Sequence, residues 1–271
     1  MKIIDGKKIS EEILEDLKIK GAPEVFVAAV MVGEDPASLR FVERKKKFSE
    51  SIGAEFKLFK AGAESTEEDV ETMIKYLARD PECGGIMVQL PLPSYMDRKK
   101  IFDLIPEDKD VDAMKGSGNV LSPAVLTVEE ILKREAINIA EATIAIVGPG
   151  FLVGKPAAEW LRPVCKKLII IDKGDDIRTI KEADVIIVGV GERGLVKIGM
   201  LKDDAVVIDF GCSLTDEGKI CGDLNIEGIE DTDIRYTPTP GGTGPILIAK
   251  LFENFYRLNG KQAEDASISP R

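Results

Sequence analysis

The stretch TIAIVGPGFLVG, at residues 143–154, decides the fold of this chain. Its first part, residues 143–147, is almost entirely apolar, as in a parallel strand that is covered by helices on both faces. The glycines that follow have the spacing GxGxxxG, close to the GxGxxG loop that joins strand to helix in a Rossmann unit. Such a loop lets the backbone approach a dinucleotide pyrophosphate, whose charge the helix amino terminus favours. The alternative is a tight strand-to-helix turn that binds no ligand.

Three more apolar stretches predict further strands of the same sheet, at residues 168–171, 185–188 and 205–208. The first of them ends at Asp172, 24 residues after Gly148. A carboxylate there can accept hydrogen bonds from the ribose hydroxyls of NAD, whereas the adjacent Lys173 can neutralise the 2′-phosphate of NADP. Both side chains are equally typical of a solvated strand end. The residues therefore leave NADP and NAD open at this position.

The first half of the chain predicts a second parallel sheet. Apolar stretches alternate there with segments of helical periodicity, which is typical of strand–helix–strand units. The expected order is a helix at 8–18, a strand at 25–32, a helix at 36–51, a strand at 56–59, a helix at 66–79 and a strand at 85–90.

A Gly-, Asp- and Lys-rich connection at residues 106–123 separates the two series of strands and predicts two domains. The expected fold class is α/β, with an N-terminal catalytic domain at residues 1–120 that contains a parallel sheet, and a C-terminal Rossmann dinucleotide-binding domain at 121–244. A helix at about 245–260 is expected to pack back on the first domain. Residues 261–271 are polar and are expected to form a flexible tail.

The composition excludes several kinds of chemistry. The 271 residues include no histidine, which rules out a Ser-His-Asp triad, a Cys-His dyad and a histidine-ligated metal. Proton transfer must therefore fall to lysine, a carboxylate, tyrosine or cysteine. The four cysteines form no CxxC pair, so we expect neither disulfides nor a bound metal.

Charge and hydropathy indicate the partners that the chain avoids. Its formal net charge of −11 argues against nucleic acids and anionic membranes. No apolar run approaches the ~20 residues that span a bilayer, and the first residues lack the apolar core of a signal peptide. We therefore expect a cytoplasmic protein that binds neither nucleic acid nor membrane.

A candidate acid–base residue lies on the helix at 36–51. Phe41 and Lys45 are four residues apart and so share one face of that helix. Crowding by Arg44 and Lys46, together with partial burial, is expected to lower the pKa of Lys45 towards neutrality, where a lysine can exchange protons. The alternative for this basic run is a solvated helix face.

Polar residues at the ends of two other segments complete the candidate site. Gln89 interrupts an apolar strand just before LPLP at residues 90–93, at the carboxyl end of a parallel sheet, where α/β proteins bind ligands. Asp110 and Asp112 lie in a loop-like stretch, where a carboxylate can accept hydrogen bonds from paired N–H donors of a heterocycle. Alternatively, Gln89 satisfies loop backbone groups and the aspartates cap a turn.

Five stretches together resemble the methylenetetrahydrofolate dehydrogenase/methenyltetrahydrofolate cyclohydrolase family, over nearly the whole chain. They are residues 32–38 (VGEDPAS) with Lys45, 85–93 (GIMVQLPLP), 109–112 (KDVD), 148–156 (GPGFLVGKP) and 237–245 (TPTPGGTGP). The resemblance implies oxidation of 5,10-methylenetetrahydrofolate to 5,10-methenyltetrahydrofolate with NADP, followed by hydrolysis to 10-formyltetrahydrofolate. It also implies a substrate cleft between the two domains.

The resemblance assigns roles to individual residues. Lys45 is the expected acid–base residue, Gln89 assists it, and Asp112 holds the pterin ring of the folate. Phe41, Pro240 and Gly241 are expected beside the substrate, together with Gln89 and Asp112. The expected cofactor site consists of Gly148, Pro149, Gly150, Gly154, Asp172, Lys173 and Cys212.

The resemblance favours NADP over NAD, with Lys173 as the partner of the 2′-phosphate and Asp172 as the opposing group. It also implies a homodimer formed through the cofactor domain. Phe41 stands where the family usually has a tyrosine, and AMK at residues 113–115 replaces the common Gly-Phe-His. These departures concern the hydrolysis more than the oxidation, so one alternative is a dehydrogenase with weak or lost cyclohydrolase activity.

Two further alternatives belong to other functional classes. A different two-domain NAD(P)-dependent dehydrogenase, acting on a small hydroxy acid or a shikimate-like substrate, would not need Gln89 and the LPLP stretch beside Lys45. A nucleotide-binding module without turnover would bind the cofactor but no folate.

Overall fold

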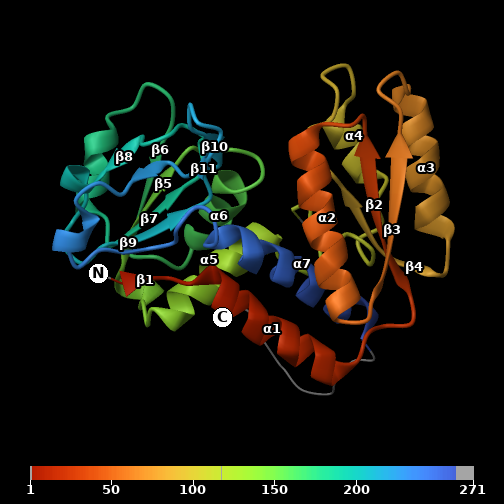
Figure 1. The fold of residues 1–271 in the computed structure, drawn as a ribbon, viewed down its shortest axis with the longest axis horizontal. Coiled ribbons are helices and arrows are strands. Elements are labelled where there is room, and N and C mark those ends of the chain that lie inside the picture. The colour runs from red at the N-terminus through yellow and green to blue at the C-terminus, as the bar shows by residue number, and fades with distance from the viewer. Residues whose placement is uncertain (1, 117, 261–271) are drawn as a thin grey trace. The chain divides into compact units, whose positions relative to one another are not determined.

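The computed structural model describes residues 2–116 and 118–260, which fall into two compact units. Unit 1 is formed from Met1–Ile13 and Ser122–Lys250, and unit 2 from Leu14–Leu121 and Leu251–Arg271. The helices α1 (Gly6–Lys20) and α7 (Thr243–Asn259) therefore contribute residues to both units. Each unit is built on a parallel β-sheet with helices packed against it (Figure 1).

Unit 1 contains a six-stranded parallel sheet with the order β1-β13-β9-β7-β5-β6. Its central strands are buried and apolar, because both faces of the sheet are covered. The strands are β1 (Lys2–Ile3), β13 (Arg235–Tyr236), β9 (Val206–Asp209), β7 (Val185–Val188), β5 (Thr143–Val147) and β6 (Lys167–Ile171).

The chain reverses its direction across this sheet at β5. It runs from β5 to β6 at the sheet edge and then crosses back to β7, on the other side of β5. In open α/β sheets a ligand binds at such a switch point, outside the carboxyl ends of the strands. The loops that follow β5 and β7 lie at this point.

Short elements complete unit 1. Its helices are α5 (Pro123–Arg134), α6 (Gly154–Leu161) and four 3₁₀ turns, η1 (Ile139–Glu141), η2 (Ile177–Glu182), η3 (Ile198–Met200) and η4 (Ile229–Asp231). Two small sheets pair β8 (Val196–Lys197) with β12 (Leu224–Asn225), and β10 (Ser213–Leu214) with β11 (Ile220–Cys221).

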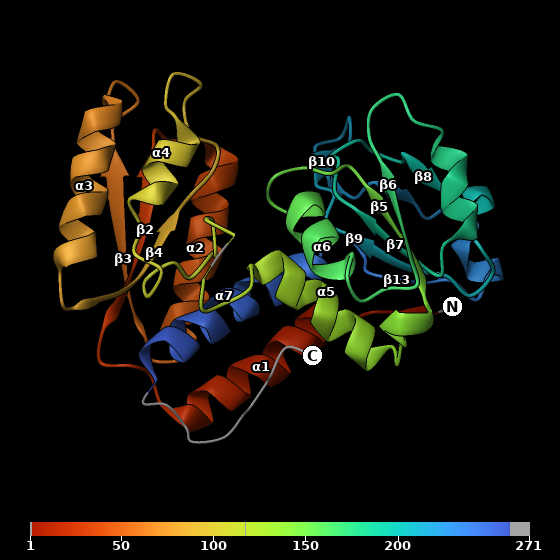
Figure 2. The same ribbon diagram turned by 180° about the vertical axis from the view of Figure 1, so that it is seen from behind.

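Unit 2 contains a three-stranded parallel sheet with the order β3-β2-β4. Because β3 and β4 lie on opposite sides of β2 and parallel crossovers are right-handed, α2 and α3 cover opposite faces of the sheet (Figures 1 and 2). The elements are β2 (Phe26–Val32), α2 (Pro36–Ser51), β3 (Glu55–Ala61), α3 (Glu67–Arg79), β4 (Cys83–Val88) and α4 (Arg98–Asp103).

The last turns of α7 belong to the interior of unit 2. The Phe252 ring stacks on Phe48 of α2 with centroids 5.3 Å apart, and Phe255 meets Phe252 edge to face. The amide of Asn254 donates hydrogen bonds to the carbonyl oxygens of Val111 (2.9 Å) and Leu121 (2.8 Å). These contacts explain why the last turns of α7 are part of this unit.

The structure differs from the sequence expectation at the N-terminus. The sequence predicts one domain from residue 1 to 120, but Lys2 and Ile3 pair with Arg235 and Tyr236 in the sheet of unit 1. Two-residue strands contain too few positions for alternation to be recognised, so the sequence predicts neither β1 nor β13. The tail predicted at 261–271 lies outside the described residues. Among the described helices, none is both long and apolar enough to cross a membrane.

Candidate active site

Helix α2 carries Lys45 into the interior of unit 2. The helix begins at Pro36, and the Asp35 carboxylate caps it by accepting the Ser38 backbone N–H at 2.7 Å. Its buried residues include Ser38, Val42 and Lys45, which follow helical spacing. Lys45 is only 4% exposed, so its ammonium group is removed from water.

Three groups surround the Lys45 ammonium. Its Nζ donates a hydrogen bond to Oε1 of Gln89 at 3.3 Å and lies 5.0 Å from the centroid of the Phe41 ring. The Gln89 amide nitrogen donates to the carbonyl oxygen of Leu90 at 2.8 Å, which orients its oxygen towards Lys45. The third group is the carboxylate of Asp112, which interacts electrostatically with Lys45. The structure thus brings together four of the residues that the sequence predicts in this domain, Phe41, Lys45, Gln89 and Asp112.

Burial lowers the pKa of Lys45 below that of an exposed lysine, and the negative charge of Asp112 opposes this shift. The expected crowding by Arg44 and Lys46 is wrong as the cause. Both side chains are exposed, and the Lys46 ammonium lies 3.8 Å from the Glu50 carboxylate, away from the Lys45 environment. Loss of hydration alone accounts for the direction of the shift.

Asp110 and Asp112 reach the site through a short extension of the sheet. The Ile86 N–H of β4 donates to the Lys109 carbonyl at 2.7 Å, and Asp110 forms a parallel bridge with Ile86. Asp112 is 9% exposed; burial raises the pKa of its carboxyl, and the charge of Lys45 lowers it. Lys45 and Asp112 therefore form a buried, mutually stabilising pair of titratable groups.

Asp110 has a different environment from Asp112. Its Oδ2 accepts the Lys115 N–H at 3.3 Å, while its buried Oδ1 has no hydrogen-bond partner among the described residues. Burial, reinforced by the charge of Asp112, raises the pKa of Asp110 to about 6. Asp110 therefore caps the turn that carries Asp112.

Ser38 is a residue that the sequence reasoning missed. Its hydroxyl donates to the carbonyl oxygen of Leu90 at 3.2 Å, and the same carbonyl accepts the Gln89 amide. The peptide bond from Leu90 to Pro91 is cis. The spacing of seven residues from Ser38 to Lys45, two helical turns, is the signal that places both on one helix face.

The predicted cofactor loop lies in unit 1, after β5. Gly148 has a φ of +85°, and a Cβ built on Gly154 would lie 2.1 Å from the Gly148 carbonyl oxygen. Only glycine fits both positions, because the loop folds tightly onto the start of α6. The residue before that helix, Val153, makes no side-chain capping hydrogen bond. Exposed Gly150 and an uncapped amino terminus fit the pyrophosphate of a dinucleotide. Pro149 lies between the two glycines in this loop.

The other predicted cofactor residues follow β6 and β9. Asp172 and Lys173 are exposed in the turn after β6, and the Lys173 N–H donates to Oδ1 of Asp172 at 2.7 Å. Cys212 is an exposed free thiol in the loop after β9. All three residues belong to loops at the carboxyl edge of the sheet, as does Gly148.

Pro240 and Gly241 lie in unit 1, between β13 and α7. Gly241 has a φ of +103°, and a Cβ on Gly6 would lie 1.7 Å from the carbonyl oxygen of Gly242. The close approach of the start of α1 gives this glycine-rich stretch a packing role within unit 1. The peptide bond from Thr239 to Pro240 is cis.

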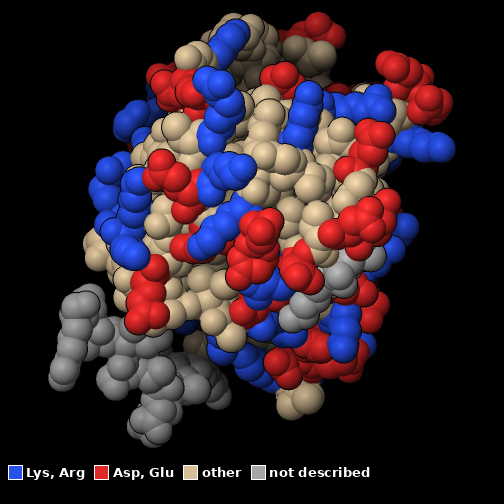
Figure 3. Space-filling view, turned by 90° about the vertical axis from the view of Figure 1, so that its left-hand side faces the viewer, with Lys and Arg blue, Asp and Glu red and all other residues tan. Residues whose placement is uncertain are grey.

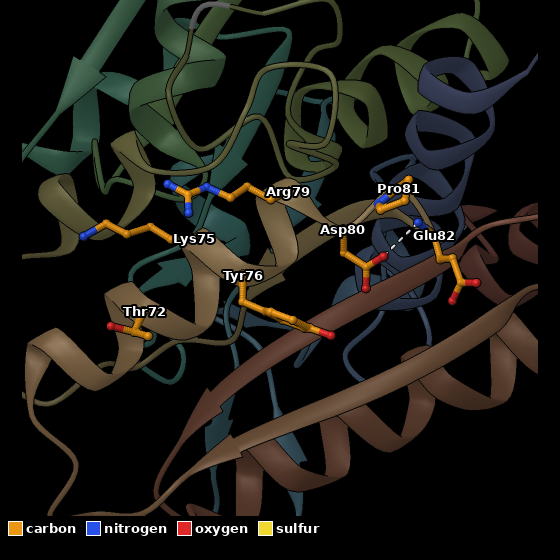
Figure 4. Close-up of a pocket in the computed structure, with 7 residues that line it drawn as sticks. All are labelled: Thr72, Lys75, Tyr76, Arg79, Asp80, Pro81 and Glu82. Atoms are coloured by element: carbon orange, nitrogen blue, oxygen red, sulfur yellow. Dashed lines mark hydrogen bonds between the residues drawn. The ribbon is translucent and has the colours of Figure 1, made fainter.

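A surface pocket of about 590 Å³ lies elsewhere on unit 2, beside the end of α3. Figure 4 shows Lys75 and Arg79 on this helix and Asp80 and Glu82 in the turn that follows it. Because α2 and α3 cover opposite faces of the sheet, this pocket is not part of the Lys45 site.

One face of the molecule shows a mixture of charges rather than a patch of one sign. On the face drawn in Figure 3, acidic and basic side chains are interspersed. Among the described residues, no group of three or more histidine, cysteine, aspartate or glutamate side chains is arranged to hold a metal ion.

Known proteins resemble this chain over almost its whole length. Residues 4–112 match the catalytic domain of tetrahydrofolate dehydrogenase/cyclohydrolase, and residues 122–263 match the NAD(P)-binding domain of the same family. The chain is 33% identical over 270 residues to the bifunctional protein FolD of Bacillus subtilis (strain 168), a match that covers 93% of this chain and 95% of that protein.

Solved structures give the same result. The bifunctional enzyme FolD from Campylobacter jejuni, a methylenetetrahydrofolate dehydrogenase/cyclohydrolase, has a TM-score of 0.90 and 31% identity, covering 96% of this chain and 98% of that one. The bifunctional 5,10-methylenetetrahydrofolate dehydrogenase/cyclohydrolase from Thermoplasma acidophilum has a TM-score of 0.86 and 27% identity, covering 95% and 98%. These matches confirm the predicted two-domain α/β architecture and the resemblance seen in the sequence.

Proposed function

The chain belongs to the tetrahydrofolate dehydrogenase/cyclohydrolase family, and we propose that Lys45 is the acid–base residue of its reactions. The protein oxidises 5,10-methylenetetrahydrofolate to 5,10-methenyltetrahydrofolate and hydrolyses that product to 10-formyltetrahydrofolate. The observation that supports the role of Lys45 is its environment. The side chain is only 4% exposed, and its Nζ donates a hydrogen bond to the side-chain oxygen of Gln89. Family membership also sets aside the hydroxy-acid and shikimate-like alternatives and the module without turnover.

Lys45 acts in the hydrolysis by moving one proton at its Nζ. A lysine whose pKa is lowered by burial supplies a neutral amine, which accepts a proton from the water that attacks the methenyl carbon. The same ammonium then returns the proton to the ring nitrogen as its bond to that carbon breaks, and the remaining hydroxyl proton of the adduct is released to solvent as the formyl C=O forms. Gln89 holds Nζ in place through its side-chain oxygen, which is itself fixed by the hydrogen bond to Leu90.

Asp112 and Phe41 orient the folate in this proposal. The buried carboxylate of Asp112 accepts hydrogen bonds from paired N–H groups of the pterin, which offsets the loss of its own hydration. Phe41 offers a ring face beside Lys45, without the hydroxyl that a tyrosine would add. Pro240 and Gly241 are proposed to contact the same substrate.

Unit 1 contains the NAD(P)-binding domain, and we propose NADP as its cofactor. Hydride acceptance from the methylene carbon is the chemistry that this group supplies when bound. Gly148, Gly150 and Gly154 would admit its pyrophosphate to the start of α6, with Pro149 shaping the turn. Lys173 is the proposed partner of the 2′-phosphate, Asp172 lies beside it, and Cys212 borders the same edge of the sheet.

Three further proposals concern the whole chain. Residues 1–120 and 121–244 are proposed as its folate-binding and cofactor-binding domains, with the N-terminal strand contributed to the sheet of the latter. The family resemblance supports a homodimer formed through the cofactor domain. A cytoplasmic location is the third proposal, and the net charge of −11 argues against nucleic acids and anionic membranes as partners.

Supplying 5,10-methylenetetrahydrofolate with NADP or NAD tests both reactions in one cuvette. Absorbance of the reduced cofactor reports the oxidation, and absorbance of the methenyl product reports its formation and decay. Adding the methenyl compound alone isolates the hydrolysis. If neither cofactor is reduced in a folate-dependent manner, the proposed function is wrong.

A further inference from the structure

A buried carboxylate in unit 1 holds the loop that follows β7. Asp223, immediately before β12, is 0% exposed. Its Oδ2 accepts the backbone N–H groups of Val190 at 2.7 Å and Gly191 at 3.0 Å. Two charge-assisted hydrogen bonds from adjacent amides fix the backbone of this loop across 33 residues of sequence.

The loop held by Asp223 lies at the switch point of the sheet. It follows β7, the strand paired with β5, and both strands run in the same direction. A Cβ built on Gly148 would lie 2.7 Å from Cγ2 of Val190, so the Val190 side chain packs directly on the first glycine of the cofactor loop. The position of Val190 therefore limits the space beside the GxGxxxG loop.

The absence of a side chain at Gly211 leaves space for the Asp223 carboxylate. A Cβ on Gly211 would lie 2.2 Å from Cγ and from Oδ1 of Asp223. The Gly211 N–H donates to Oδ1 of Asp209 at 2.7 Å, and Oδ2 of Asp209 accepts the Leu224 N–H at 2.9 Å. Asp209 thus holds Leu224, which follows Asp223 in the sequence, and Gly211, whose backbone lies against the Asp223 carboxylate. Together, the two aspartates join the loops after β7 and β9 to the start of β12.

We propose that Asp223 is a positioning residue for the dinucleotide: its carboxylate holds Val190 and Gly191 so that the loop after β7 leaves the site beside Gly148 open. This inference rests on the proposed cofactor-binding function of unit 1. Asp223 itself is buried and acts only through the two amides. Without its carboxylate, those N–H groups lose their partner and the loop is free to move across the site.

The effect is expected on cofactor affinity rather than on the chemical step. A preformed loop reduces the ordering that binding requires, so loosening it weakens binding to a folded protein. Side chains that touch the folate are unchanged. The KM for NADP should therefore rise, while kcat and the KM for the folate stay nearly constant.

The experiment compares Asp223→Asn and Asp223→Ala with the wild-type chain, measuring the Kd of NADPH by its fluorescence. Asparagine keeps one acceptor oxygen without the charge, so an increase in Kd of about tenfold is expected; alanine removes both hydrogen bonds, and an increase on the order of a hundredfold is expected. The KM for 5,10-methylenetetrahydrofolate should change by less than about twofold.

Asp184→Asn is the matched control. Asp184 immediately precedes β7, and the loop that Asp223 holds follows the other end of that strand. Oδ2 of Asp184 accepts the Thr143 N–H at 2.8 Å, and Asp184 forms an ion pair with Lys202. This variant should lower the thermal unfolding midpoint without changing the Kd of NADPH. If Asp184→Asn and Asp223→Asn weaken NADPH binding equally, affinity follows stability alone and the inference is overturned.

The remaining outcomes separate this inference from the function on which it rests. A wild-type chain that binds neither NADPH nor NADH contradicts both the proposed function and this inference before any substitution is made. A wild-type chain that binds NADPH, with Asp223→Asn binding equally well, overturns the positioning role alone. The asparagine variant keeps the measurement possible if the alanine variant does not fold.

Discussion

The Nζ atom of Lys45 lies 3.3 Å from Oε1 of Gln89, and the lysine that makes this contact is only 4% exposed. A side-chain amide oxygen can accept a hydrogen bond from an ammonium without adding a negative charge. The contact therefore orients the lysine while burial continues to lower its pKa. An acid in place of Gln89 would orient the same atom but would favour its charged form.

Replacing Lys45 with methionine should remove the hydrolysis while leaving cofactor binding intact. Methionine has a similar length and no titratable group, so the packing of α2 is largely retained. We expect the rate of methenyltetrahydrofolate hydrolysis to fall by at least about a hundredfold, as for loss of a general base. The Kd of NADPH should stay within about twofold, because the substitution lies outside the cofactor domain. Hydrolysis is followed by the loss of methenyl absorbance.

Lys46→Met is the control for this variant. Lys46 is the next residue on α2, and its side chain is 47% exposed. The same change of net charge should leave hydrolysis unaffected. Unchanged hydrolysis in the Lys45 variant would remove that residue from its proposed role.

Replacing Gln89 with glutamate should shift the pH dependence of hydrolysis. A carboxylate about 3 Å from Nζ favours the ammonium and therefore raises the pKa of Lys45. Since the neutral amine is the proposed base, the rising limb of the pH–rate profile should move to higher pH. Gln89→Leu removes the same hydrogen bond without adding charge, and its profile should not move upwards. A glutamate variant with the wild-type midpoint contradicts the assignment of that limb to Lys45.

The sequence predicts the long elements of this fold because they contain recognisable patterns. The strands β2, β5 and β7 are apolar runs, and Asp35 with Pro36 marks the start of α2. A strand of two residues, such as β1, is too short to show such a pattern. Its place in the sheet of unit 1 depends on pairing with β13, more than 200 residues away.

The sequence analysis named partial burial as a cause of the lowered pKa of Lys45, but it wrongly added crowding by Arg44 and Lys46. Its neighbours Arg44 and Lys46 are charged in the sequence and suggest repulsion. The packing of α2 decides instead that they face solvent and that Lys45 faces the sheet with Val42. Burial of a single charged residue in a basic run is a consequence of tertiary packing, which local composition does not record.

Replacing Asp172 with serine should improve the use of NADP. The Asp172 carboxylate lies in the turn after β6, where the adenosine ribose of a dinucleotide is expected in this fold. Its removal lessens repulsion of the 2′-phosphate, and the KM for NADP should fall by about three- to tenfold relative to that for NAD. Initial rates with each cofactor give the ratio.

Asp216→Ser serves as the control for the cofactor measurement. Asp216 is exposed in the turn between β10 and β11, and its loss changes the net charge of unit 1 by the same amount. The ratio of the two KM values should not change in this variant. If the Asp172 variant also keeps the wild-type ratio, its carboxylate points away from the 2′ position.

Asp110→Asn should alter the pH dependence of stability. The pKa of Asp110 is raised from 3.8 to about 6, so between these values the folded chain holds a proton that the unfolded chain has released. Stability from this group is therefore present below pH 4 and is lost as the pH rises towards 6, by at most about 3 kcal/mol. Asparagine carries no proton equilibrium, yet its side-chain oxygen can still accept the Lys115 N–H.

Comparing the two chains removes the contribution of Asp209, whose raised pKa affects both alike. Asp112 contributes to the difference, because its charge acts on Asp110. Relative to the wild type, the unfolding midpoint of the Asp110 variant should rise from pH 4 to about pH 6 and then level off. Asp108→Asn, an exposed change two residues away, should give a curve parallel to the wild type. Parallel curves for Asp110→Asn as well would mean that Asp110 is ionised in the folded protein across this range. The turn that carries Asp112 would then contain a buried carboxylate whose charge is stabilised by groups other than the Lys115 N–H.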